Sequence, residues 1–143
     1  MIKRLIIPVL LIFMALSPPV FADPELIRLA KEGDADAQRN LGLMYDLGVG
    51  VPQDDKAAVK WYTLAAEQGD TDAQYNLALM YANGEGVIQD NVYAHMWFNI
   101  AGSNGYEGAA AARATVANRL TAADLSKAQD LARDCVRKEY KGC

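Results

Sequence analysis

Hydrophobic residues recur with a helical period along most of the chain. Two series between residues 34 and 69 carry apolar side chains at i, i+4, i+7 and i+8 or at i, i+3, i+4 and i+7. Either spacing places the series on one face of a helix with 3.6 residues per turn. The first series comprises Ala37, Leu41, Met44 and Tyr45. The second comprises Ala58, Trp61, Tyr62 and Ala65. No stretch alternates apolar and polar residues over the length of a strand, so the pattern predicts an all-helical fold.

The residues around each series predict where the helices begin and end. Asp34 and Asp54 precede the two series and can cap helix N-termini. Their neighbours Asp36 and Asp55 are interpreted as first-turn acids stabilised by the helix dipole and not as metal ligands. Gly48-Val49-Gly50 allows a tight reversal between the helices, and a glycine, Gly69, ends the second.

The helix pair is repeated. Shifting the chain by 36 positions superposes residues 34–69 on residues 70–105 with 18 of the 36 positions identical. A period of this length in a helical chain predicts an α-solenoid, in which each unit buries its apolar face against its neighbours. Four large side chains at helical spacing are assigned to the core: Trp61, Trp97, Met44 and Met80.

The flanks supply further helices to the stack. Residues 23–33 resemble the second half of a unit, and residues 106–143 predict a capping helix pair. This pair consists of an Ala-rich helix over residues 108–119 and a last helix from residue 122 to about residue 140, which Thr121 and Asp124 begin with a capping box. The prediction is a right-handed α-solenoid of about seven helices.

The N-terminus has the pattern of an export signal. Lys3 and Arg4 precede an apolar run over residues 5–16, and Val20-Phe21-Ala22 forms a cleavage-like site. The alternative is an uncleaved anchor, but a membrane span needs roughly 20 apolar residues. We therefore expect residues 1–22 to be removed and residues 23–143 to form one periplasmic or secreted domain without membrane insertion.

Export determines how the two cysteines are interpreted. Cys135 and Cys143 lie eight positions apart, and a left-handed turn at Gly142 can bring them together in a disulfide. A disulfide between two chains and two free thiols are the alternatives, and the oligomeric state is left open. One His and two Cys make a poor ligand set, so no metal or cofactor is predicted.

Charge narrows the class of partner. The whole chain has a formal net charge of -4, and residues 34–105 hold ten acidic and three basic residues. Nucleic-acid binding needs clustered Lys and Arg, so it is not expected. An acidic surface favours a neutral or basic protein partner through interactions that weaken as salt rises. A face kept acidic for solubility is the alternative.

The repeated motifs resemble those of the Sel-one-like repeat (SLR) family, relatives of the tetratricopeptide repeats. The matching strings are Asp-Ala-Gln-x-Asn-Leu, Met-Tyr, Gly-x-Gly-Val, Gln-Asp and Trp-Tyr/Phe-x-x-Ala before a closing Gly. The resemblance implies an α-solenoid that works as an adaptor and holds a peptide or protein segment on its concave face.

The resemblance also suggests binding residues. In related tetratricopeptide proteins an Asn of the first helix faces the groove and hydrogen-bonds a bound peptide, and Asn40 and Asn76 match that position. Residues near them differ between the repeats, Arg39 against Tyr75 and Asp46 against Ala82. The predicted binding set is Arg39, Asn40, Asp46, Tyr75 and Asn76. Alternatively, the two asparagines tie adjacent helices together.

Catalysis is not expected. Some secreted SLR proteins have been linked to β-lactam binding or hydrolysis, so a weak hydrolase or β-lactam-binding protein is the alternative function. Ser103 and Ser126 are the only serines after the signal, and neither has a Lys three positions on. His95 takes the place of Val59 and is interpreted as a packing or helix-surface residue. The repeats also lack the internal Cys pair of those relatives.

Overall fold

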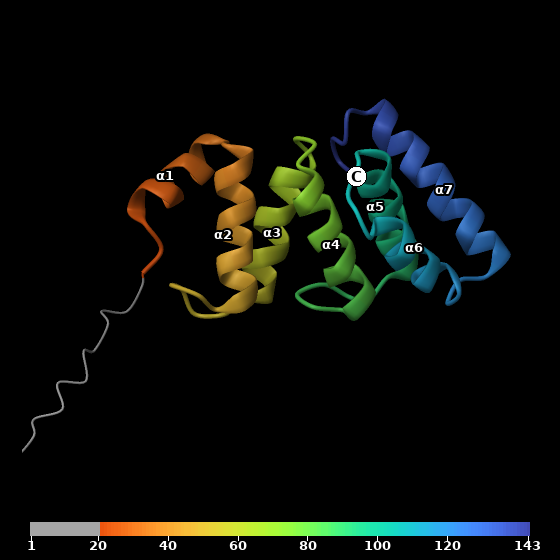
Figure 1. Cartoon of the computed structure of the whole chain (residues 1–143), viewed down its shortest axis with the longest axis horizontal. Coiled ribbons are helices and arrows are strands. Elements are labelled where there is room, and N and C mark those ends of the chain that lie inside the picture. The colour runs from red at the N-terminus through yellow and green to blue at the C-terminus, as the bar shows by residue number, and fades with distance from the viewer. Residues whose placement is uncertain (1–20) are drawn as a thin grey trace, which may run out of the picture.

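The structure is a row of helices. The computed structural model describes residues 21–143, in which all regular secondary structure is α-helical. The helices are α1 (Pro24–Glu32), α2 (Ala35–Leu47), α3 (Asp55–Ala66), α4 (Thr71–Asn83), α5 (Asn91–Ser103), α6 (Ala109–Ala117) and α7 (Ala122–Arg137). They follow one another from one end of the molecule to the other (Figure 1). The seven helices predicted from the sequence are confirmed.

The predicted signal lies almost entirely outside the described residues. Of its 22 positions, only Phe21 and Ala22 are described. Ala22 is buried, and its N–H donates to the carbonyl oxygen of Gly50 at 2.9 Å. No helix among residues 21–143 is long and apolar enough to cross a membrane.

Aspartate side chains begin the helices of both repeats. Asp34, Asp54 and Asp70 each accept a hydrogen bond from the backbone N–H three residues later, at 2.7–3.0 Å. Asp90 accepts from two backbone N–H groups at the start of α5. These contacts satisfy donors that have no partner inside the helix. The capping role expected for Asp34 and Asp54 is confirmed.

The glycine loop between the helices of a repeat requires one residue to be glycine. Gly86 has a φ of +69°, in the left-handed region. A Cβ on Gly86 would lie 2.3 Å from the carbonyl oxygen of Asp55, at the start of α3. The loop of the second repeat therefore lies directly on the second helix of the first repeat, and this close approach is possible only for a residue without a side chain.

The core consists of a large apolar cluster over the two repeats and a smaller one at the N-terminal end. Trp97 and Met80 are buried in the large cluster. Their equivalents Trp61 and Met44 are only half-buried and pack against the smaller cluster. The core prediction is confirmed in full for the second repeat and in part for the first, because only the single helix α1 covers that end of the stack.

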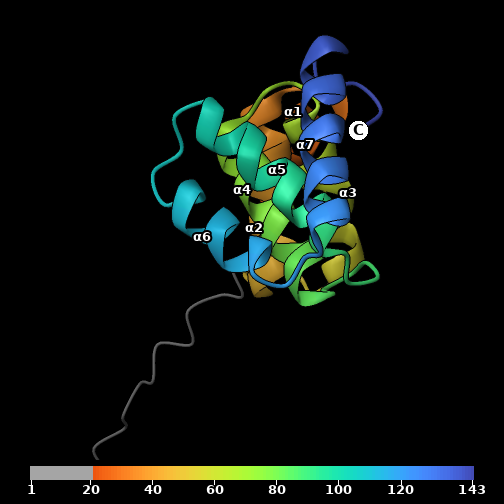
Figure 2. The same ribbon diagram turned by 90° about the vertical axis from the view of Figure 1, so that its right-hand side faces the viewer.

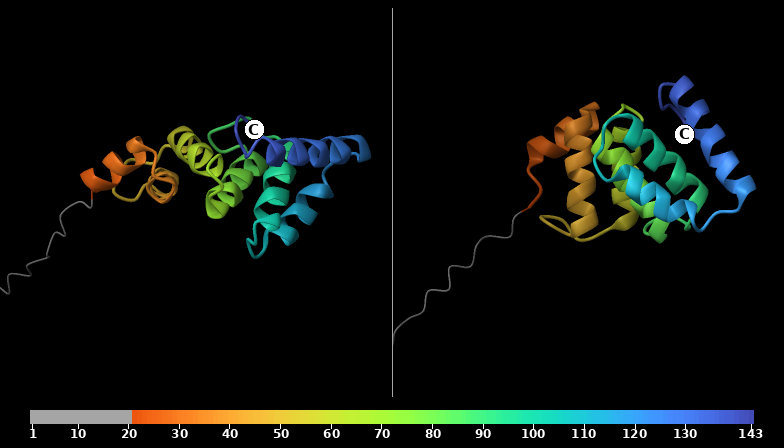
Figure 3. Two further views of the ribbon diagram at one scale, coloured as in Figure 1. Left: turned by 90° about the horizontal axis from the view of Figure 1, so that it is seen from above. Right: turned by 45° about the vertical axis from the view of Figure 1, so that its right-hand side comes forward.

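The C-terminal helices differ from the helix pair expected over residues 106–143. Helices α6 and α7 both pack on α5, more than on each other. They lie on opposite sides of α5 when the molecule is seen end-on (Figure 2) and in the view turned by 45° (Figure 3, right). The last two helices therefore diverge from their connecting loop and do not close into a hairpin like α2–α3 or α4–α5.

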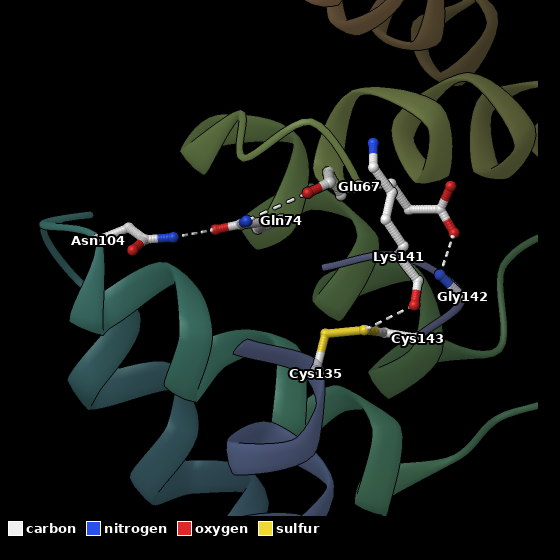
Figure 4. The surroundings of a disulfide bond; sticks show 8 residues. Glu67, Gln74, Asn104, Cys135, Lys141, Gly142 and Cys143 are labelled. Atoms are coloured by element: carbon white, nitrogen blue, oxygen red, sulfur yellow. Dashed lines mark hydrogen bonds between the residues drawn. A yellow bond between two sulfur atoms is a disulfide. The ribbon is translucent and has the colours of Figure 1, made fainter. Parts of the chain in front are cut away.

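The chain reverses earlier than the sequence suggests. Helix α7 ends at Arg137, and Glu139 and Tyr140 adopt positive φ values of 51° and 66° before Gly142 does so at 64°. The reversal brings Cys143 onto Cys135 in an intramolecular disulfide with a Cα–Cα distance of 5.5 Å. Figure 4 shows the N–H of Gly142 donating to the carboxylate of Glu67, at the end of α3.

Candidate partner-binding surface

The first helices of the two repeats present equivalent exposed leucines beside the predicted asparagines. Asn40, Leu43 and Leu47 follow one another at i, i+3 and i+7 on α2, so they share one face. Leu43 is 42% exposed and Leu47 is 62% exposed. The equivalent face of α4 carries Asn76 and Leu79, and Leu79 is 36% exposed. We call this set of five residues the leucine–asparagine surface.

The two asparagines have different surroundings. Asn40 is exposed, whereas Asn76 is half-buried close to the hydroxyl of Tyr62. The amide of Asn40 is therefore accessible to a partner. The Asn76 amide is the one that fits the alternative of a link between helices.

Arg39 connects the two repeats by ion pairs. Its Nη1 lies 2.9 Å from a carboxylate oxygen of Asp70 and 3.5 Å from one of Asp72, both at the start of α4. It also lies 3.1 Å from Asp36 on its own helix. Three carboxylates thus share one guanidinium, so Arg39 adds little free positive charge to the surface.

The second repeat makes the same connection with aromatic rings. Tyr75 occupies the position of Arg39 and stacks on Tyr106, with ring centroids 4.1 Å apart. Tyr106 is the position equivalent to Asp70 under the 36-residue shift. Both members of the contact have therefore changed together, from an ion pair between repeats to an aromatic stack against the cap.

Asp46 also has a contact partner within the chain. The buried Tyr62 on α3 donates its hydroxyl to Asp46 at 3.2 Å. Burial raises the pKa of Asp46, the hydrogen bond from Tyr62 lowers it, and the nearby carboxylates Glu85 and Asp55 raise it. Burial and the charge of Asp46 raise the pKa of Tyr62, so its proton stays on the hydroxyl.

The second repeat lacks both partners of this hydrogen bond. Ala82 replaces Asp46 and Phe98 replaces Tyr62. The differences between repeats at residues 39 and 46 are thus matched by differences at their intramolecular partners, and they do not by themselves indicate a ligand. Partner binding by Arg39, Asp46 and Tyr75 stays a prediction.

Sequence reasoning did not find the role of two buried glutamines. Gln38 donates to the carbonyl oxygen of Ala30 at 3.0 Å and accepts from Gln68 at 2.8 Å. One repeat later, Gln74 donates to Ala66 and accepts from Asn104, as Figure 4 shows. Each glutamine links its helix to the preceding and following helix ends, and its identity in both repeats was the available signal.

Metal-ligating side chains do not gather in the described part of the chain. Residues 21–143 contain no group of three or more His, Cys, Asp or Glu side chains arranged to hold a metal ion. The expectation that the protein carries no metal or cofactor stays a prediction.

Comparison with known proteins identifies the repeat. A model of the Sel1 repeat matches residues 35–70 and 71–106. The chain belongs to the Sel1 repeat family. The matched units are offset by one residue from the 36-residue periods read in the sequence, and they join at the start of α4.

Two solved structures show the same fold. One is a protective antigen present in uropathogenic Escherichia coli strains that displays an SLR fold; it is 32% identical with a TM-score of 0.76, and the match covers 80% of this chain and 26% of that one. The second is a Sel1 repeat protein from Oxalobacter formigenes, 38% identical with a TM-score of 0.61, covering 63% of this chain and 68% of that one. This Sel1 repeat chain spans about a quarter of the length of the antigen. A comparison with curated proteins finds no match.

Proposed function

We propose that this Sel1 repeat protein is an interaction module that holds a peptide or one helix of a partner on the leucine–asparagine surface. The observation that carries the proposal is the repetition of exposed leucines at equivalent positions, Leu43 and Leu79. Burying a fully exposed leucine contributes about 1.5–3 kcal/mol. These leucines are 36–62% exposed and can gain a proportional part of that energy, so two or three of them support a modest affinity. Asn40 beside them offers an amide donor and acceptor for the backbone of a partner.

The charges around the surface favour a neutral or basic partner. Asp36 and Asp72 are exposed at the starts of α2 and α4, and Arg39 between them is already paired with both. A bound carboxylate would meet net negative charge here, whereas a Lys or Arg of the partner would meet carboxylates. We expect the affinity to fall several-fold between about 50 and 300 mM salt; an affinity independent of salt would contradict the role of charge.

The proposed site of action is the periplasm or the cell exterior. The disulfide between Cys135 and Cys143 supports this proposal, because disulfides persist in oxidising compartments.

A peptide-display selection against the purified protein tests the surface. Peptides enriched by the wild type are measured against Leu43→Glu and Leu79→Glu, which place a charge in the apolar contact. Leu64→Glu on α3 is the matched control, because Leu64 is 37% exposed and lies on the second helix of its repeat. We expect the first two variants to lose binding at least tenfold and the control to retain it. Equal losses in all three, or none, would contradict the proposal.

Asn40→Ala isolates the polar contribution within the same assay. We expect a smaller loss than for the leucine variants, about two- to tenfold, because a single hydrogen bond contributes about 0.5–1.5 kcal/mol. Unchanged binding would show that the partner does not use this amide.

A further inference from the structure

A cleft lies where α6 and α7 diverge over α5. A cavity of about 370 Å³ there is lined by side chains of all three helices. Its polar lining consists of His95, Asn99, Arg113, Gln129 and Arg133. This surface is separate from the leucine–asparagine surface on α2 and α4.

The residues of the cleft depart from the repeat pattern. Arg113 occupies the position of Leu41 and Leu77, which are both buried in the apolar clusters. His95 occupies the position of Val59, which packs against the large cluster. Both positions would be apolar if this junction only continued the stack, and a guanidinium is costly to bury without a charged partner.

Within the described part of the chain, no carboxylate neutralises Arg113. The residue is half-buried, and its guanidinium donates to the neutral side-chain oxygen of Asn99 at 2.5 Å. Among residues 21–143, no Asp or Glu oxygen lies within 4 Å of it. In a chain with more acidic than basic residues, this leaves uncompensated positive charge inside a cavity.

His95 forms part of the wall of the same cavity. The residue is only 3% exposed, and within the described chain its Nδ1 has no hydrogen-bond partner. Burial and the charge of Arg113 lower the pKa of His95, so the imidazole is neutral at pH 7 and one of its nitrogens carries a hydrogen. An unsatisfied buried polar atom costs about 1–3 kcal/mol. Because Nδ1 has almost no accessible surface, the imidazole has to turn toward the cavity for a ligand to bond this atom and recover that cost.

The cleft adjoins a second cavity of about 440 Å³, which shares Asn99 and Arg133 with the first. Its apolar wall consists of Ile100, Ala132 and Val136. Its charged wall consists of two ion pairs, Arg133 with Asp130 and Arg137 with Asp134, so these carboxylates are already neutralised. The two spaces together offer the unpaired charge of Arg113 at one end and an apolar wall at the other.

We propose that the cleft between α6 and α7 binds a carboxylate attached to an apolar body. The carboxylate accepts hydrogen bonds from Arg113 and from the imidazole of His95, and the apolar body lies against Ile100 and Val136. Two sources have this chemistry, a free organic acid and the C-terminus of a peptide that ends in an apolar residue.

Calorimetric titration of the full chain with matched probes tests the proposal. The probes are octanoate against octanamide, and acetyl-Ala-Ala-Leu with a free carboxylate against its C-terminal amide. We expect the carboxylate of at least one pair to bind at least tenfold more tightly than its amide, and the pair that binds identifies the source. Binding by no probe, or equal binding of acid and amide, would overturn the proposal.

Substitutions place the binding in the cleft. Arg113→Leu restores the residue found in both repeats, so we expect it to keep or raise the melting temperature while weakening the carboxylate about 10- to 100-fold. His95→Val restores the residue of the first repeat and is expected to weaken binding about tenfold. Arg119→Leu removes an exposed Arg after α6 and is the control. Equal loss in the control, or unchanged binding in Arg113→Leu, would overturn the assignment.

Discussion

Single residues that are identical in both repeats hold backbone segments together. Gln38 and Gln74 bond helix ends, and Gly86 lies against the backbone of Asp55. Residues that differ between repeats change with their contact partners, as Asp46 and Tyr62 do. The residue type at each of these positions is therefore explained by the side chains and backbone atoms that it contacts within the chain.

Gly86→Ala should destabilise the protein by about 2–4 kcal/mol. The substitution adds the cost of a left-handed φ, about 1–2 kcal/mol, to a clash with the carbonyl of Asp55. Gly105→Ala is the control, because Gly105 also has a positive φ but no atom lies within 4 Å of the place that its Cβ would take. Urea denaturation measures both, and an equal loss would show that the close approach contributes nothing.

Asp46→Asn should stabilise the protein at pH 7. Burial raises the pKa of Asp46, so the folded state binds this proton more tightly than the unfolded state does. This tighter proton binding stabilises the folded state fully at pH values below the usual Asp pKa. The stabilisation is lost as the pH rises through the raised pKa of Asp46, so at pH 7 the buried carboxylate is charged and unfavourable.

The oxygen of the introduced amide would still accept a hydrogen bond from the hydroxyl of Tyr62. Urea midpoints should therefore differ at pH 7 and converge near about pH 3, where Asp46 is protonated. The control is Glu107→Gln at an exposed position. A variant less stable than the wild type at pH 7 would show that the ionised carboxylate is favourable.

Helices are joined differently at the two interfaces between successive units. Between the repeats the contact is Arg39 with Asp70, and between the second repeat and the cap it is Tyr75 with Tyr106. The first contact is an ion pair, and the second is a stack of two half-buried aromatic rings. The same two positions of the repeat therefore join successive units in both places, once by an ion pair and once by an aromatic stack.

Asp70 both begins α4 and binds Arg39, and substitutions separate the two roles. Asp70→Ala should lower the free energy of unfolding by about 1–2 kcal/mol, because it removes the cap and one ion pair. Asp70→Asn keeps a capping oxygen, so we expect about half that loss or less. Thermal and urea denaturation measure both, and equal losses would assign the whole effect to the ion pair.

The whole molecule is a stack whose two ends are covered in different ways. At the N-terminal end α1 alone packs on α2, whereas at the C-terminal end α6 and α7 both pack on α5. The disulfide holds the last residue against α7, and Gly142 beside it bonds Glu67 at the end of α3. The hydroxyl of Tyr140 also donates to Asn104, which bonds Gln74. The C-terminal reversal thus holds Asn104 in place for its hydrogen bond with the buried Gln74 of the second repeat.

Cys135→Ser/Cys143→Ser should lower the free energy of unfolding by about 2–3 kcal/mol, the value for a disulfide that closes a loop of this length. Hydrogen exchange should accelerate in residues 138–143 and at the end of α3, where Gly142 binds Glu67, and should stay unchanged in α2. Reductant should reproduce the effect in the wild type only. A reductant-sensitive double variant, or faster exchange throughout, would contradict this account.

The sequence by itself determined the helices and their repetition. Helical periodicity, capping aspartates and loop glycines act over a few residues, so the seven helices, the caps at Asp34 and Asp54 and the Sel1 repeat family were predictable without coordinates. The pairing of Cys135 with Cys143 was predictable too, because only a short segment separates them.

Tertiary structure alone decided which residues of different units meet. The contact of Arg39 with Asp70 joins residues 31 positions apart, and the cleft around Arg113 exists because α7 packs on α5 and not on α6. A local sequence pattern does not specify these long-range contacts, because they depend on how the apolar faces of several helices are buried together. For the same reason, the sequence did not predict the cleft that contains His95 and Arg113, because its lining comes from three different helices.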